Sequence, residues 1–197
     1  MTRLNGLLND FGKLLKDQQA PIFDKLQVGL DFDEIDSLLK PEGINNAELR
    51  LLYKWRNGIK DLQNYTIDEL ELFPEGIMLS LSGSLSHYEI YTQVEKIWDK
   101  SLFPIFTNGG GDYFLLDIES ESKTEGMVFL YAPSLLLSDS PVTIYDSIEN
   151  LIDTVLECFK HHAYKLSNEK NIVIVDYDLR QKISKNKNPE SIYWKLQ

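Results

Sequence analysis

The sequence predicts an α+β fold, because apolar patterns with a helical period come first, strand-like apolar runs follow, and another strong helical pattern comes after them. Regular alternation of strands and helices would instead indicate parallel βαβ units. The chain has 197 residues, of which 43% are hydrophobic, so it is long enough to bury a sizeable core. We therefore expect a single domain over 1–197.

Four helices are predicted before the strands. Asn45 or Asn46 can cap the third of them, and Gly58, with Asn57 before it, is suited to close it. Acidic residues crowd the start of the second helix, where the helix dipole favours them. The predicted helices cover residues 4–17, 31–40, 45–58 and 84–100, with a turn-rich stretch at 66–80.

Strand-like runs of apolar residues dominate the middle of the chain. They cover 102–106, 113–118, 126–133 and 141–147, the last of which could also be a helix entry. An amphipathic helix with Ser147 as its N-cap is predicted over 147–166. Residues 171–178 form another apolar run that could be a strand, and the last 20 residues, being polar, are expected to be frayed or loosely docked.

Three consecutive glycines, Gly109, Gly110 and Gly111, separate two of these runs in "LFPIFTNGGGDYFLLDI" (102–118). A phosphate-binding loop needs a lysine or a following helix, and neither is present. The acid after the glycines, Asp112, would also repel a phosphate. We therefore expect a tight turn that needs positive φ. Asp112 either hydrogen-bonds to neighbouring N–H groups of this turn or faces a partner.

The sequence shows no recognisable catalytic or metal-binding set. It has three histidines and one cysteine, and it lacks the HExxH, CxxC and GxSxG patterns. Cys158 falls on the apolar face of a predicted helix and is expected to be a buried, inert thiol. We expect a protein that is not an enzyme and has no cofactor and no metal. The single cysteine, and the lack of a leader-like or membrane-length apolar run, favour a cytoplasmic protein without membrane contact.

Charge is distributed unevenly along the chain. Residues 1–159 hold 27 acids and 12 Lys or Arg, whereas residues 160–197 hold 4 acids and 8 Lys or Arg. An acidic body disfavours nucleic acid and favours basic partners. The acids of the segment 117–126 belong either to a solvated hairpin loop or to a docking patch for a basic partner. Trp55 is either an anchor of the core or a contact to a partner. The candidate partner-binding residues are Trp55, Asp112, Asp117, Glu119, Glu121 and Glu125.

Several segments, taken in order, resemble the SMI1/KNR4 family of the SUKH superfamily. "LLYKWRNG" (51–58) is similar to a helix ending of that family, and "LFPIFTNGGGDYFLLDI" is similar to its strand–turn–strand with a glycine pair. "YDSIENLIDTVLECF" (145–159) stands where the family has its closing helix, and 73–81 loosely resembles its middle stretch. The chain departs from the family pattern in having Arg56 and a third glycine. The resemblance covers about residues 30–160 and leaves 165–197 as an extension.

The resemblance implies a mixed, mostly antiparallel sheet flanked by helices, and no shared catalytic activity. Many bacterial members of the family look like immunity proteins that bind and block a toxin, so it implies a cognate protein toxin as partner. Together with the acidic body, this predicts a basic toxin, possibly a nuclease. Members linked to cell-wall synthesis and signalling leave an alternative, which is a ligand-sensing or scaffold module.

Overall fold

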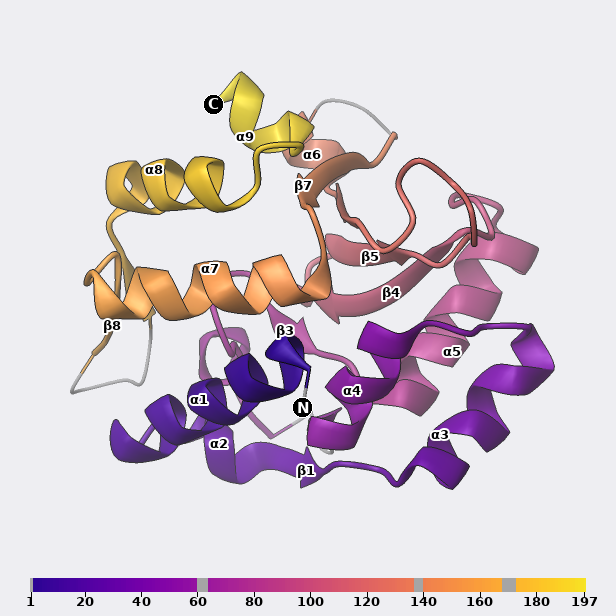
Figure 1. Ribbon diagram of the computed structural model, residues 1–197, viewed down its shortest axis with the longest axis horizontal. Coiled ribbons are helices and arrows are strands. Elements are labelled where there is room, and N and C mark those ends of the chain that lie inside the picture. The colour runs from indigo at the N-terminus through magenta and orange to yellow at the C-terminus, as the bar shows by residue number, and fades with distance from the viewer. Residues whose placement is uncertain (1, 60–63, 137–139, 168–172) are drawn as a thin grey trace.

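A five-stranded sheet lies at the centre of the computed structural model, which describes residues 2–59, 64–136, 140–167 and 173–197 (Figure 1). Its strand order is β3-β4-β5-β6-β7, and each neighbouring pair is antiparallel. The predicted α+β fold with a mostly antiparallel sheet is thereby confirmed. The strands are β3 (Ile77–Met78), β4 (Leu102–Thr107), β5 (Tyr113–Asp117), β6 (Val128–Tyr131) and β7 (Val142–Tyr145).

Both faces of this sheet are covered, and β5 shows how. Phe114 and Leu116 point into the main core, whereas Tyr113 and Leu115 point the other way, into a smaller cluster that contains Trp98. Side chains alternate between the two faces of a strand, so a sheet covered on both sides needs apolar residues at every position. This explains why the sequence shows continuous apolar runs here rather than an alternating pattern.

Helices surround the sheet, and Figure 1 shows α1 and α8 on either side of α7. The predicted helices at 4–17 and 31–40 are confirmed, the second with a capping box between Asp31 and Glu34. The helices are α1 (Arg3–Asp17), α2 (Ile22–Lys25), α3 (Phe32–Leu39), α4 (Ala47–Trp55), α5 (Leu81–Glu89), α6 (Pro133–Leu136), α7 (Ile148–Lys160), α8 (Tyr177–Lys187) and α9 (Ile192–Leu196). Short 3₁₀ segments lie at Lys40–Glu42 and Ile67–Glu69.

The helix predicted over 45–58 ends earlier, at Trp55. Asn57 and Gly58 do not close it, because they belong to the short strand β2 (Arg56–Ile59), which pairs with β1 (Leu26–Val28). The Asn57 side chain instead accepts a hydrogen bond from the N–H of Leu81, at the start of α5. Gly58 has φ +64, and a Cβ there would lie 2.4 Å from the backbone of Leu79. Glycine is therefore required at position 58 by the close approach of the Leu79 backbone, and not because it ends a helix.

Two other predicted helices are also too long. The helix predicted over 84–100 begins earlier, at Leu81, and α5 ends at Glu89. A π-helical turn at Ile90–Val94 follows, and residues 95–100, which the structure describes, are not helical. The helix predicted over 147–166 has the expected cap at Ser147 but ends at Lys160. A turn with His162 at φ +61 follows it and leads into β8 (Tyr164–Leu166). That strand pairs with β9 (Val173–Val175), which lies within the predicted run 171–178, of which 171–172 fall outside the described residues.

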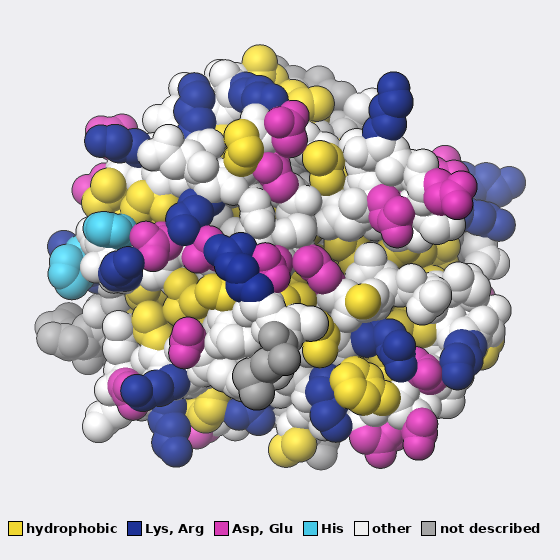
Figure 2. Space-filling model, viewed as in Figure 1, with side chains coloured by type: hydrophobic (Ala, Val, Ile, Leu, Met, Phe, Trp, Pro, Cys, Tyr) yellow, Lys and Arg dark blue, Asp and Glu magenta, His cyan; other side chains and the backbone are white. Residues whose placement is uncertain are grey.

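The last 20 residues are not frayed, contrary to the prediction. They contain most of α8 and all of α9, and the side chain of Trp194 is only 4% exposed against Tyr145. Lys187 of α8 and Arg3 of α1 both bind Asp153 of α7, at 2.9 and 2.7 Å. The basic segment thus docks on the acidic body through the Lys187–Asp153 pair, and Arg180 of α8 adds a pair with Glu75. Figure 2 accordingly shows acidic and basic side chains interspersed on this face.

Candidate functional site

The glycine turn between β4 and β5 is organised by Asn108. Its Oδ1 accepts hydrogen bonds from the N–H groups of Gly110 and Asp112, at 2.7 and 3.0 Å, and its Nδ2 donates to the Asp112 carboxylate at 2.8 Å. Gly109 and Gly111 have φ of +75 and +107, values that only glycine adopts readily. Asn108, rather than Asp112, therefore binds the backbone of the turn. The Asp112 carboxylate is held at its edge.

Asp112 lines a hollow of about 360 Å³ whose floor is formed by Phe114 and Leu130 of the sheet. Glu75 and Leu135 line this hollow and also a second one of about 420 Å³, formed against the C-terminal helices. We call the two together the Glu75 groove. Its main lining residues are Glu75, Asp112, Phe114, Leu130, Leu135, Tyr177, Asp178, Arg180, Tyr193 and Trp194.

Apolar and aromatic surface is exposed along the groove. Leu135 is 59% exposed and Tyr177 is 69% exposed, and Tyr193 is half-buried beside Trp194, with 4.7 Å between their ring centroids. Large exposed apolar side chains that gather in a hollow are typical of binding surfaces. The groove therefore has the character of a contact surface rather than of a reaction centre.

Carboxylates give the groove a negative rim. Burial and the nearby Glu75 raise the pKa of Asp112. Burial also raises the pKa of Glu71, which accepts the N–H of Glu75, to about 7, and the charges of Asp68 and Glu75 add to this effect. Like charges held together in this way favour the arrival of a cation. Arg180 is the buried cation of the groove, and it pairs with Glu75 at 3.4 Å.

The acidic loop 118–127, between β5 and β6, lies at the opposite end of β5 from Asp112 (Figure 1). Asp117 is only 3% exposed and accepts hydrogen bonds from the Glu119 N–H and from the hydroxyls of Ser122 and Thr124, at 2.7 to 2.9 Å. It shapes the loop and does not face solvent. Three glutamates of the loop are exposed, namely Glu119, Glu121 and Glu125.

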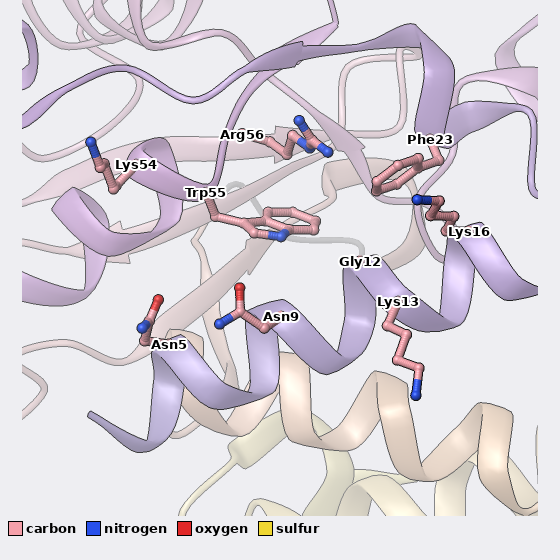
Figure 3. A pocket seen from close by; sticks show the side chains of 9 residues that line it. All are labelled: Asn5, Asn9, Gly12, Lys13, Lys16, Phe23, Lys54, Trp55 and Arg56. Carbon is pink, nitrogen blue, oxygen red and sulfur yellow. The ribbon is translucent and has the colours of Figure 1, made fainter. Parts of the chain in front are cut away.

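The structure therefore separates the predicted site residues. Six residue steps along β5 divide Asp112 from the start of the acidic loop at Ile118, which is about 20 Å at roughly 3.3 Å per residue. Trp55 lies elsewhere again, stacked on Phe11 with 5.8 Å between ring centroids, and it lines a third hollow with Arg56 and Phe23 (Figure 3).

Sequence reasoning missed Glu75, Tyr177 and Tyr193. Glu75 sits at φ +69 in the turn before β3 and carries no motif. The tail did hold a signal, since Tyr177, Tyr193 and Trp194 are three aromatic residues in an otherwise polar segment. Aromatic residues there indicate docking rather than fraying.

Within the described residues, no group of three or more His, Cys, Asp or Glu side chains is placed to hold a metal ion. Cys158 is buried, and burial raises the pKa of its thiol to about 12, which makes it a poor nucleophile at neutral pH. Among those same residues, no helix is long and apolar enough to cross a bilayer.

Comparison with known families identifies a match over the middle of the chain. The model of the SMI1 / KNR4 family (SUKH-1) matches residues 46–154, which is more than half of the chain. The matched stretch contains the sheet, the glycine turn and the acidic loop, and it leaves α1, α8 and α9 outside. A search of curated proteins found no match.

Proposed function

This chain belongs to the SMI1/KNR4 family, and we propose that it acts as an immunity protein that binds a cognate basic toxin and blocks it by direct contact. The single observation that carries the proposal is the Glu75 groove, where exposed aromatic and apolar side chains stand beside carboxylates. The protein occludes its target in this proposal and does not modify it.

The chemistry of the groove suits lysine and arginine side chains. Tyr177 offers an exposed ring on which the stem or guanidinium of a basic residue can lie. Asp178 follows it on the same helix. Glu75 lines the same hollow, and Asp112 lines the adjoining one on the sheet side. Interface hot spots are rich in tyrosine, tryptophan and arginine side chains that pack on one another across the interface. A basic loop of a toxin is therefore the occupant that the groove favours.

The acidic loop has a different part in this proposal. Glu119, Glu121 and Glu125 stand on a loop that Asp117 already shapes, so the loop backbone is ordered before a partner arrives and the ordering cost is reduced. Exposed charges of this kind raise the association rate more than they add affinity. We leave Trp55 out of the toxin surface, because cations line its hollow and would repel a basic partner.

The test is to co-express the protein with the product of the neighbouring gene and to measure growth rescue and co-purification. The double variant Tyr177→Ala/Asp178→Asn removes the aromatic residue and the acid at the first two positions of α8. We expect affinity for the toxin to fall by about tenfold or more, because hot-spot residues dominate binding.

The matched control is Phe32→Ala/Asp33→Asn, since these residues are also an exposed aromatic and an acid at the first two positions of a helix, α3. The control should bind as the unaltered protein does. Equal loss of affinity in both variants would refute the groove as the docking surface. Absence of both binding and growth rescue with the neighbouring product would refute the immunity role.

A further inference from the structure

A third hollow, of about 440 Å³, lies between α1, α2 and the junction of α4 with β2. Trp55 and Phe23 supply its aromatic surface (Figure 3). Gly12 lets α1 come close to the indole, since a Cβ at this position would lie 3.3 Å from Trp55 Nε1. The hollow has the volume of a small-molecule site.

Every charged residue that the structure describes along this hollow is a cation, and they are Lys13, Lys16, Lys54 and Arg56. Within the described part of the chain, none of the four forms an ion pair. Other cations of the chain, such as Arg3, Arg50 and Lys187, do pair with acids. A concentration of unpaired positive charge in a hollow raises the local concentration of anions.

The cations are arranged around the aromatic surface. Figure 3 shows Arg56 and Lys16 turned toward the gap between Trp55 and Phe23, while Lys13 and Lys54 extend outward at the rim. The Arg56 guanidinium lies over the Phe23 ring, 4.7 Å from its centroid. Its Nε is buried and has no hydrogen-bond partner among the described residues. The planar fork of a guanidinium suits phosphate oxygens, which it can bind in pairs.

We propose that this hollow binds a small phosphate ester that carries a planar ring, of the size of a mononucleotide. The ring would lie in the gap between Trp55 and Phe23, where it would stack on an aromatic side chain. The phosphate would meet Arg56 and Lys16. A carboxylate carries one negative charge, whereas a phosphate carries close to two and so matches the two cations that turn toward the gap. The proposal does not depend on toxin binding, because the Glu75 groove is built from other residues.

The test is titration of the full chain with adenosine monophosphate and guanosine monophosphate, followed by calorimetry and tryptophan fluorescence. Adenosine without its phosphate and inorganic phosphate alone are the two partial ligands. We expect saturable binding of at least one monophosphate, weaker binding of inorganic phosphate and the weakest binding of the nucleoside. Added salt should weaken the complex, since charge drives it.

The variant Arg56→Gln/Lys16→Gln should weaken monophosphate binding by about tenfold or more, the usual effect of losing charge-assisted hydrogen bonds. Lys16→Gln alone changes an exposed side chain, so it tests the site even where the double variant folds poorly. The control Lys182→Gln/Lys185→Gln removes two exposed lysines of α8 and should bind normally. Failure of both monophosphates to bind, or equal binding by the nucleoside, would overturn the proposal. So would equal loss of binding in the control.

Discussion

The Trp55 hollow and the Glu75 groove combine the same two ingredients, aromatic surface and charge, but with charges of opposite sign. The Trp55 hollow is assembled within residues 5–56, the first third of the chain, with Trp55 and Arg56 adjacent and the rest on α1, α2 and α4. The groove unites Glu75, Asp112 and Tyr177, which are far apart in the chain. The net charge of −11 therefore describes the field far from the protein and not the chemistry of either hollow.

Trp194→Ala should separate the two regions most strongly. The side chain is 4% exposed and packs on Tyr145 and Arg180, so its removal should lower the free energy of unfolding by about 3 to 5 kcal/mol. The groove loses a wall in this variant, while the Trp55 hollow keeps all of its lining. Chemical denaturation with the two ligand assays measures both effects. Equal loss of toxin and monophosphate binding in the folded variant would show that the hollows are not independent.

Asp117→Ala should come next in size. The buried carboxylate accepts three hydrogen bonds, and its removal leaves their donors without this acceptor, which should cost about 2 to 3 kcal/mol. The acidic loop should then exchange its amide hydrogens faster, while amides around the glycine turn should keep their protection. Hydrogen exchange by mass spectrometry reports both segments. An unchanged loop would contradict the role given to Asp117.

A smaller, pH-dependent effect is expected from Glu71→Gln beside the groove. The pKa of Glu71 is raised from 4.5 to about 7, so the folded state favours the neutral acid. Its contribution to stability is present below about pH 4.5 and is lost as pH rises through about 7. The variant should therefore gain about 1 to 2 kcal/mol at pH 8, discounted for solvent screening, and little at pH 4.5. Urea unfolding at the two pH values measures this, and an equal gain at both would contradict the assignment.

The smallest effect on stability is expected from Glu119→Gln/Glu121→Gln/Glu125→Gln. These side chains are exposed, so unfolding should change by only a few tenths of a kcal/mol. The association rate with a basic toxin should fall several-fold, with little change in dissociation rate. Stopped-flow kinetics at low and high salt separates the two rates. A change confined to dissociation would place the loop inside the contact instead of beside it.

The sequence predicted best where local pattern and final contacts agree. The β4–turn–β5 unit and the Ser147 cap of α7 are of this kind, since apolar runs, positive-φ glycines and a side-chain cap act over a few residues. Asn57 and Gly58 were misassigned because their roles depend on Leu79 and Leu81, more than twenty residues away. No local pattern encodes such a contact.

The same difference between local patterns and long-range contacts explains which residues of the candidate site the sequence could predict. Asp112 and Trp55 were predicted as partner contacts from their residue types, and the structure places each in a different hollow. Glu75 and Tyr177 could not be linked to Asp112, because only the docking of α8 and α9 brings the tail to the sheet. Nothing in the sequence distinguishes Asp117 from the exposed acids that follow it. Its burial could not be predicted, because it results from the way the loop folds around its carboxylate.

The docking of the tail has a consequence for how such a protein can diverge. One bank of the groove lies within the stretch shared with the family, and the other is supplied by α8 and α9, outside that stretch. Exposed tail positions such as Tyr177 and Asp178 can change without disturbing the buried Trp194 anchor. Substitutions at exposed positions of α8 and α9 would thus change which partner the groove accepts, while the domain core shared with the family stays the same.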